Sequence, residues 1–406
     1  MKRSLGRITA TTDVHSQLGD AAGLLAHLHA ERPHSLIVDC GDFFEGTGYY
    51  RLGGGSIERT ILTTLYDVIA PGNHGWRHHF EPGLHELTVC ANAVDADSGK
   101  PLFRRLHLAQ VGGRTVAVTA VIAPQAFNAI PAADRAGHRV TEPARALVEL
   151  LLEHHHVADT WVLLSHSGFE EDLQLAADCP FLDIVFAGHC HSDHYAPEPV
   201  GDTLVVKGAE LAAGYAVAEP VGHGWAARTC RFPTAPAVPA ELEPIARRIA
   251  ELRDKLTVPL VRIAERWQHQ VPDRHQLLTE VADRLHHSLG APAVVLNETA
   301  LRPAPLGEVL HLEDLLAIEP FDNQLVHALL PEALAANMPG LLAHLTERAG
   351  PLVLAPDPWP TGLRSVLTTD YLAETFLDGR THPAGLQLGQ AVRHVLADPT
   401  EEGEPT

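Results

Sequence analysis

The feature that most constrains this chain is a set of short apolar runs that each end in side chains able to bind metal. The clearest run, Asp183–Ala187, leads into Gly188, His189, Cys190 and His191. Four apolar residues before a tight turn predict a buried parallel strand, and α/β sheets place their ligands at the carboxyl ends of such strands. Two histidines one residue apart can address two metal positions, although this stretch alone fits a structural histidine pair equally well.

Four runs further upstream end in the same way, which strengthens the metal interpretation. Strands are expected at 7–12, 35–39, 66–70 and 160–166, and they deliver Asp13, His15, Asp42, Asn73 and His166 to their ends. Segments of helical periodicity separate them, at 18–32, 57–65 and 143–156. Another strand is expected at 87–93, and a hairpin around Gly112 and Gly113. This alternation predicts a layered α/β domain.

Length and charge narrow the class of protein. A chain of 406 residues has room for two domains with a core each. Its 30 basic and 51 acidic residues give a net charge of −21, which repels a nucleic-acid duplex. A small anionic substrate would need local positive charge, which metal cations supply. The five cysteines show no paired spacing.

The ends of the chain and its linkers suggest where the domains lie. We expect a first domain at 1–232, a proline- and alanine-rich linker with a connecting helix at 233–257, and a smaller α/β domain at 258–396. Residues 397–406 are acidic and lack apolar anchors, so we expect a disordered tail. Residues 1–4 lead directly into the first predicted strand, and no apolar run approaches about 20 residues. We therefore expect a cytoplasmic protein without a membrane partner.

Together these motifs resemble the calcineurin-like metallophosphoesterases, and within them the bacterial 5'-nucleotidase family. The resemblance implies an α/β-sandwich domain with a dinuclear metal site, followed by a 5'-nucleotidase C-terminal domain. It implies two divalent metal ions, which are manganese, zinc, cobalt or iron. One ion is held by Asp13, His15, Asp42 and His191, and the other by Asp42, Asn73, His166 and His189, with Asp42 bridging. Mixed carboxylate, amide and imidazole ligands suit such a site.

The resemblance also implies a reaction. A hydroxide that bridges the two cations attacks phosphorus in line, and His74 donates a proton to the departing alkoxide. The alternative for His74 is a loop histidine that packs the turn.

One position departs from the family pattern. The family usually reads Gly-Asn-His-Glu-Phe-Asp, and this chain reads Gly-Asn-His-Gly-Trp-Arg at 72–77. Arg77 thus stands where an aspartate would orient the histidine. Either His74 is a weaker acid, or it uses a partner from elsewhere, or the substrate has an easier leaving group. Arg77 itself either contacts a phosphate oxygen or lies on a solvated loop.

The second half of the chain carries a weaker resemblance. Residues 294–302 are similar to the family's Asn-x-Gly-Gly-x-Arg loop, with Asn297 and Arg302 in place and both glycines replaced. Residues 312–323 are similar to a helix that runs into Pro-Phe-x-Asn, and 363–372 resemble the closing strand. The resemblance implies that Asn297, Arg302 and Phe321 bind a nucleotide, and stacking on one aromatic ring is worth about 1–3 kcal/mol. Core packing is the alternative for Phe321, and the second stacking aromatic is unplaced, with Trp359 as a guess.

The sequence therefore predicts a metal-dependent phosphohydrolase that acts on a small nucleotide or a related phosphate ester, most simply a 5'-nucleotidase-like phosphomonoesterase. A cyclic-nucleotide phosphodiesterase or a nucleotide-sugar pyrophosphatase on the same fold stays open. A nucleotide-binding protein with a vestigial site is the alternative from another class. The base, the metal and the oligomeric state are left open.

Overall fold

The computed structural model describes residues 3–398, except 191–194, 235, 331–334, 336, 361 and 378. The chain divides into two compact units, Met1–Arg253 and Asp254–Thr406. The boundary falls within helix α8 (Glu243–Leu256), inside the segment expected to be linker and connecting helix. Most of the expected acidic tail, 399–406, lies outside the described residues. No helix of the described residues is long and apolar enough to cross a membrane.

The first unit contains two large sheets. The five-stranded sheet has the order β13-β12-β1-β2-β3, formed by Gly224–Arg231, Gly214–Val221, Arg7–Thr11, Ser35–Asp39 and Val68–Ile69. The six-stranded sheet has the order β10-β11-β9-β8-β6-β5, formed by Glu198–Val200, Thr203–Lys207, Ile184–Ala187, Thr160–His166, Arg114–Ile122 and His107–Val111. The expected hairpin at 106–122 is the antiparallel pair β5 and β6.

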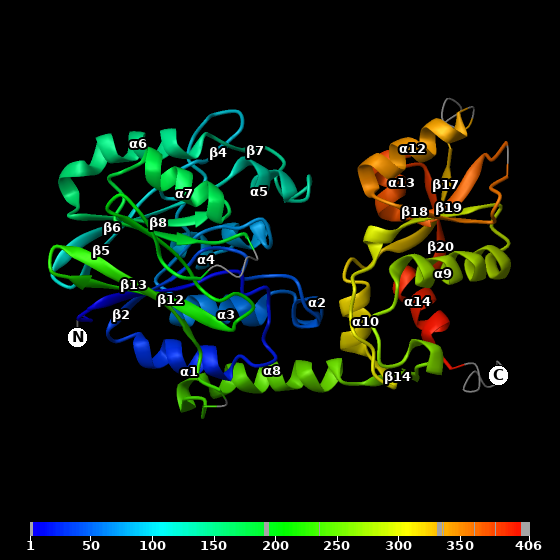
Figure 1. The fold of residues 1–406 in the computed structure, drawn as a ribbon, viewed down its shortest axis with the longest axis horizontal. Coiled ribbons are helices and arrows are strands. Elements are labelled where there is room, and N and C mark those ends of the chain that lie inside the picture. Colours follow the sequence, from blue (N-terminus) through cyan, green and yellow to red (C-terminus); the bar gives the residue numbers. More distant parts are fainter. Residues whose placement is uncertain are drawn as a thin grey trace. The chain divides into compact units, whose positions relative to one another are not determined.

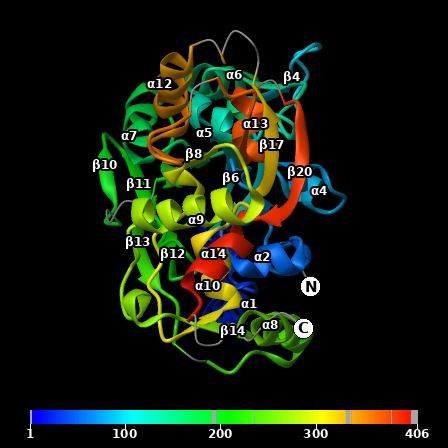
Figure 2. The ribbon, with the colours of Figure 1, turned by 90° about the vertical axis from the view of Figure 1, so that its right-hand side faces the viewer.

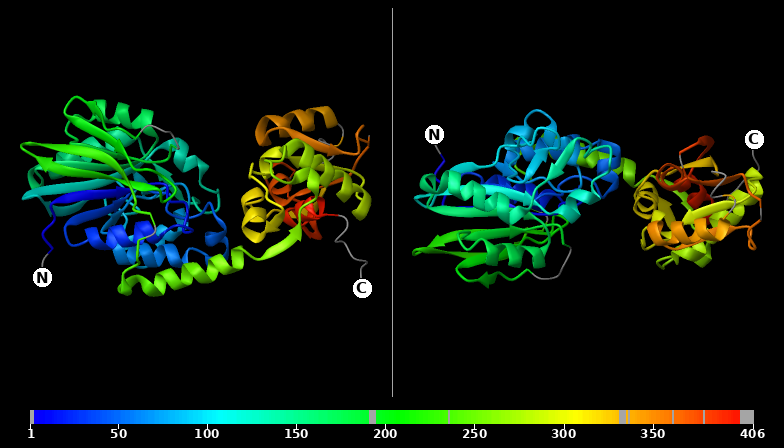
Figure 3. Two further views of the ribbon diagram at one scale, coloured as in Figure 1. Left: turned by 60° about the horizontal axis from the view of Figure 1, so that its bottom comes forward. Right: turned by 90° about the horizontal axis from the view of Figure 1, so that it is seen from above.

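The strands that precede the predicted ligands run parallel to one another within each sheet. Strands β1, β2 and β3 are parallel neighbours, and so are β8 and β9. Their registers bring the strand ends level, with Thr11 opposite Asp39 and Ser165 opposite Ala187. Strands β12 and β13 are the last strands of this unit, and they extend the sheet beyond β1, on the side opposite β2 (Figure 3). Each sheet thus gathers its loops at one edge.

The two sheets pack face to face, and helices cover their outer faces. The core between the sheets includes Ile8, Val38, Val118, Leu164 and Phe186. Helices α6 (Pro143–His154) and α7 (Phe169–Asp178) cover the six-stranded sheet, and α1 (Ala22–Glu31) and α3 (Ser56–Leu65) lie on the opposite side (Figure 1). Strand β8 is buried along its whole length, as expected for a strand covered on both faces. The predicted α/β sandwich is confirmed.

The prediction of a strand at 87–93 is wrong. Helix α4 (Leu84–Leu87) occupies its start, and Thr88 and Val89 make only isolated bridges, to Ile69 and Arg104. The run is apolar because it is buried in the loops between the sheets and the helices, and burial alone does not make a strand. A short strand begins only at β4 (Ala93–Asp95), which pairs with β7 (His138–Val140). Shorter helical segments complete the unit: α2 (Gly48–Gly53), η1 (Trp76–Phe80), α5 (Pro124–Ala129), η2 (His155–Val157) and η3 (Ala240–Leu242).

The second unit is built on a mixed five-stranded sheet. Its order is β18-β15-β19-β17-β20, formed by Leu352–Ala355, Val294–Asn297, Ser365–Thr369, Gln324–Leu329 and Thr381–Gln387. Helices α9 (Arg274–Leu289) and α14 (Leu388–Leu396) pack on one face, and α12 (Met338–Ala349) and α13 (Asp370–Phe376) pack on the other (Figure 2). The remaining elements are β14 (Pro259–Arg262), β16 (Val309–His311), α10 (Leu312–Ile318), η4 (Glu265–Trp267) and η5 (Glu298–Ala300).

The segment expected to be a closing strand at 363–372 changes form partway. Strand β19 ends at Thr369, whose hydroxyl accepts a hydrogen bond from the backbone N–H of Leu372. This is an N-cap, and it starts helix α13 at Asp370. Tyr371 therefore lies in the first turn of a helix and not on a strand.

Candidate metal centre

The predicted metal ligands lie just beyond the ends of parallel strands from both sheets. Asp13 and His15 follow β1, Asp42 follows β2, and Asn73 follows β3. The other sheet contributes His166, the last residue of β8, and His189, two residues after β9. Because all five strands end at the same edge of the sandwich, residues that are far apart in the sequence meet there.

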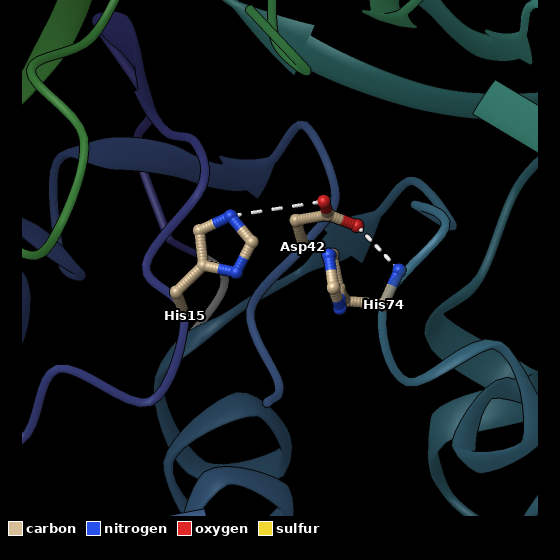
Figure 4. Close-up of side chains that lie close together, drawn as sticks. All are labelled: His15, Asp42 and His74. Atoms are coloured by element: carbon tan, nitrogen blue, oxygen red, sulfur yellow. Dashed lines mark hydrogen bonds and ion pairs between the residues drawn. The ribbon is translucent and has the colours of Figure 1, made fainter. Parts of the chain in front are cut away.

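Asp42 is the centre of the cluster. It belongs to two groups whose potential ligand atoms all lie within 4.8 Å of one another, one with His15 and His74 and one with His166 and His189. One oxygen, Oδ2, is 3.8 Å from His15 Nε2, and the other, Oδ1, is 3.3 Å from His166 Nε2. Figure 4 shows Asp42 between His15 and His74, whose backbone N–H donates to Oδ1 at 2.8 Å. The two carboxylate oxygens thus face two different imidazoles, as a bridging ligand requires.

Two further predicted ligands join the cluster. The Asp13 carboxylate lies 4.0 Å from His15 Nε2 and accepts the backbone N–H of His189 at 3.1 Å. Asn73 Oδ1 lies 3.1 Å from His166 Nε2. The His166 Nδ1–H donates to the Cys40 carbonyl at 2.9 Å, which turns Nε2 toward the cluster. The structure brings together six of the seven predicted ligands.

The seventh predicted ligand, His191, lies outside the described residues. The assignment of individual ligands to two cations therefore stays a prediction. His74, predicted as an acid and not as a ligand, is near enough to Asp42 and His15 to belong to one of the candidate groups.

The backbone of the cluster contains several uncommon conformations. Asp13, His15, Asp42 and His189 have positive φ angles of 48°, 49°, 54° and 74°. Residues with a β-carbon rarely adopt this left-handed conformation, because the side chain approaches the following carbonyl group. Such strain persists when the surrounding structure holds it, and it is concentrated at binding and catalytic sites. Here it turns the side chains of four predicted ligands into one cluster.

Two glycines are required because the loops pack against each other without space for a side chain. A β-carbon at Gly72 would lie 2.0 Å from Asp42 Oδ1, and one at Gly41 would lie 2.7 Å from His166 Nδ1. Gly41 also has a φ of +99°. The Gly-Asp and Gly-Asn-His motifs therefore owe their glycines to the close approach of the ligand loops.

The charges of the cluster favour bound cations. Burial acts to raise the pKa of Asp42, but the neighbouring His166 outweighs it and lowers that pKa below its usual range. Burial acts to lower the pKa of His166, and Asp42 outweighs it, so this pKa rises to about 9. Buried carboxylates thus attract positive charge, and the carboxylate, amide and imidazole donors suit a divalent transition metal. The residues present fit two metal ions.

A nearby aspartate supports the loop without joining the cluster. Asp39 accepts hydrogen bonds from Thr11 Oγ1 at 2.6 Å and from the Gly41 N–H at 3.0 Å. Burial raises the pKa of Asp39 to about 8. Its contacts fix the turn that carries Asp42.

In the structure, the carboxylate that contacts the His74 ring belongs to Glu45. His74 Nδ1 lies 2.9 Å from Glu45 Oε2, on the loop that carries Asp42. Arg77, in contrast, donates to the Tyr50 hydroxyl at 3.0 Å, and its side chain is exposed. Of the open possibilities, the geometry matches a partner from elsewhere in the chain. No sequence pattern links positions 45 and 74, so Glu45 was missed.

The second unit has a cavity of about 480 Å³ at the predicted substrate residues. Its lining includes Asn297, Arg302, Phe321, Asn323, Asp370 and Tyr371. Phe321 is 47% exposed, so it is not a core residue, and the guanidinium of Arg302 lies 5.1 Å from its ring centre. Tyr371 is exposed to the same extent. Trp359, the guess for the second aromatic, packs against the core beside α12 and is not among the residues that line this cavity.

The fold and the cluster together limit the class of protein. Two packed sheets place carboxylate, imidazole and amide groups at their strand ends, centred on one shared aspartate, and such a set of donors suits divalent metal ions. Residues 6–193, just under half of the chain, match the family model of the calcineurin-like phosphoesterases.

Comparison with individual proteins agrees with this match. The chain is 24% identical over 228 residues to the trifunctional nucleotide phosphoesterase protein YfkN of Bacillus subtilis, covering 45% of this chain and 15% of that protein. It is 24% identical over 225 residues to the 5'-nucleotidase of Bos taurus, covering 47% and 39%. The chain therefore spans less than half the length of these curated relatives.

Solved structures show that both units have known counterparts. The 5'-nucleotidase precursor of Thermus thermophilus aligns with a TM-score of 0.68 at 19% identity over 96% of both chains. The 5'-nucleotidase of Candida albicans aligns with a TM-score of 0.67 at 13% identity over 98% of both. A sulfate thiohydrolase, SoxB of Thermus thermophilus, aligns equally well, with a TM-score of 0.68 at 17% identity over 98% of this chain and 95% of that one. The shared fold is thus compatible with more than one substrate.

Proposed function

We propose that this chain is a divalent-metal-dependent phosphomonoesterase that releases phosphate from a nucleotide. The observation that carries the proposal is Asp42, whose two oxygens face His15 and His166 in two adjoining groups of potential ligands. The names of the curated relatives, a nucleotide phosphoesterase and a 5'-nucleotidase, support a nucleotide as substrate.

The chain's own residues have distinct parts in this reaction. Asp13, His15, Asp42, Asn73, His166 and His189 would hold two cations, which we propose to be manganese, zinc, cobalt or iron. Bound there, such cations supply Lewis-acid activation of water and positive charge for the phosphoryl oxygens. His74 holds the proton for the departing oxygen, because Glu45 engages Nδ1 and leaves Nε2 as the ring's other nitrogen.

We propose that the cavity of the second unit holds the base of the nucleotide. Phe321 and Tyr371 offer exposed aromatic faces, and bases stack on such faces regardless of sequence. Arg302 adds a polar group that can contact the sugar or the base. Asn297 also lines the cavity, but it is 2% exposed and its side-chain amide donates to the Thr299 hydroxyl, so its part is to hold the loop. A bare phosphate ester would gain nothing from these residues.

A substrate panel tests the proposal. The purified chain, loaded with manganese, cobalt or zinc, is incubated with nucleoside monophosphates, a 2',3'-cyclic nucleotide, a nucleotide sugar or 4-nitrophenyl phosphate, and both the free phosphate and the organic products are measured. We expect the highest kcat/KM for a nucleoside monophosphate. Preferred cleavage of the cyclic nucleotide or of the nucleotide sugar would replace this function by a diesterase or a pyrophosphatase. Binding without turnover of any substrate would indicate a vestigial site.

A further inference from the structure

We propose that Glu45 is the positioning residue of His74, fixing its imidazole so that Nδ1 carries a proton and Nε2 meets the leaving group. This inference rests on the proposed phosphomonoesterase function and deepens it. The carboxylate comes from the Asp42 loop and not from position 77, where the family pattern has an aspartate and this chain has Arg77.

The first argument is the geometry of the Glu45 carboxylate. Oε2 lies 2.9 Å from His74 Nδ1, and Oε1 accepts the backbone N–H of Gly75 at 3.0 Å. The two oxygens thus contact both the imidazole ring and the backbone of the next residue. A carboxylate held at two points fixes a ring better than one held at a single point. Glu45 therefore sets the orientation of the ring relative to its own loop.

The second argument comes from what else contacts His74. Asp42 accepts the backbone N–H of His74, and this contact does not constrain the ring. The His15 ring lies edge-on, with its centre 4.9 Å from that of His74, and supplies no carboxylate. Arg77 is engaged with the Tyr50 hydroxyl. Among the described residues, Glu45 is the carboxylate hydrogen-bonded to the His74 ring.

Exposure and backbone strain agree with this role. The side chain of His74 is 41% exposed, so a ligand can reach it while Glu45 holds the opposite nitrogen. Glu45 has a φ of 66°, an uncommon conformation for a residue with a β-carbon. The strain at Glu45 thus continues the strain of the neighbouring ligand Asp42, which indicates that the whole loop is shaped for the site.

The charge of the pair is consistent with hydrogen bonding between an imidazole N–H and a carboxylate. Burial acts to raise the pKa of Glu45, but the hydrogen bond and the charge of His74 outweigh it and lower that pKa. Glu45 is therefore ionised and accepts the proton of Nδ1. In a neutral imidazole bound this way, Nε2 is the acceptor nitrogen, and on protonation it becomes the donor.

The chain offers a matched control. His78 Nδ1 lies 2.7 Å from Glu81 Oε1, the same kind of pair in the same unit, and neither residue belongs to the candidate metal groups. Glu45→Gln and Glu81→Gln remove one carboxylate charge each with the same change of shape. Gln at 45 also keeps an oxygen for the Gly75 N–H, which limits damage to the loop.

The experiment compares two leaving groups. Hydrolysis of a nucleoside monophosphate expels the nucleoside as a poor alkoxide leaving group that needs a proton, whereas hydrolysis of 4-nitrophenyl phosphate expels a stable phenolate. We expect Glu45→Gln to lower kcat for the nucleotide about 10–100-fold and to change kcat for the aryl phosphate by less than about twofold. Glu81→Gln should leave the ratio of the two rates unchanged. In a His74→Ala background, Glu45→Gln should cost nothing further, because both changes remove one function.

Two further measurements accompany the kinetics: one tests whether each variant folds correctly, and the other tests the tautomer of His74. Metal content of each variant reports whether the ligand loops are intact. Imidazole ¹⁵N shifts of the unaltered zinc-loaded protein, assigned with His74→Ala, should show a proton on Nδ1 of His74. A bare Nδ1, or equal slowing of both substrates in Glu45→Gln at full metal content, would overturn the positioning role and leave the phosphatase proposal intact. If the unaltered chain releases no phosphate from any nucleotide, the proposed function falls before any variant is made.

Discussion

The metal centre and the cavity of the second unit are built in opposite ways. Asp13, Asp42 and His166 are at most 2% exposed and hydrogen-bonded, and the two aspartates lie on loops with positive φ angles. Phe321 and Tyr371 are each 47% exposed, and the cavity that they line contains both apolar and polar side chains. Charges interact strongly where water is excluded, while stacking on an exposed ring is weak and tolerant of geometry. The centre is therefore suited to chemistry and the cavity to substrate choice.

This contrast predicts different kinetic signatures. Substitutions in the centre should lower kcat for every phosphate ester, because they remove charge that acts on the phosphoryl group. Substitutions in the cavity should raise KM, and only for substrates that carry a base.

The largest effect of a single substitution is expected for Asp42→Asn. Asp42 belongs to both candidate groups, so losing its charge weakens both metal positions. We expect kcat/KM to fall by about 10³-fold or more for nucleotide and aryl phosphate alike, and metal content, measured by mass spectrometry, to drop. A variant that keeps two metals and nearly full activity would show that Asp42 is not the bridge.

Gly72→Ala tests whether the centre depends on its close packing. The new β-carbon would lie 2.0 Å from Asp42 Oδ1, so the carboxylate must move. A displacement of about 1 Å at such a site costs about 100-fold in rate, and we expect a loss of that order in kcat. Gly224→Ala is the control, since nothing lies within 4 Å of a β-carbon there. Equal activity of the two variants would contradict the packing argument.

The cavity is tested by Phe321→Ala and Tyr371→Ala. Loss of a stacking face worth about 1–3 kcal/mol should raise KM for a nucleoside monophosphate about tenfold and leave 4-nitrophenyl phosphate nearly unchanged. Both residues are exposed, so thermal stability should change little. Similar losses for both substrates would show that these rings do not select the base.

The smallest effect is expected for Arg77→Ala. The guanidinium donates to the Tyr50 hydroxyl, and the side chain is exposed. We expect KM for nucleotides to change by less than about threefold, as is usual for a surface contact. A tenfold rise in KM would instead show that Arg77 contacts the phosphate of the substrate.

The same contrast explains what the sequence predicts and what it does not. Side chains that can bind a metal are few in type. Asp13, Asp42 and His166 therefore stand out as candidate ligands at the ends of strands that the apolar pattern delimits well, such as Thr160–His166. Glu45 meets His74 through the packing of two loops, and no local pattern encodes such a contact. The sequence did not place Tyr371 at the cavity, because its segment was expected to be a strand, while the cap at Thr369 starts a helix.

The most direct test of the account is a metal titration of the intact chain. Metal-free protein, prepared by chelation, is titrated with manganese, cobalt or zinc while bound metal and phosphate release from a nucleoside monophosphate are followed together. The account predicts no release without metal, and full activity when two ions are bound per chain. Full activity of the metal-free protein, or full activity with a single ion bound, would contradict a dinuclear metallophosphoesterase.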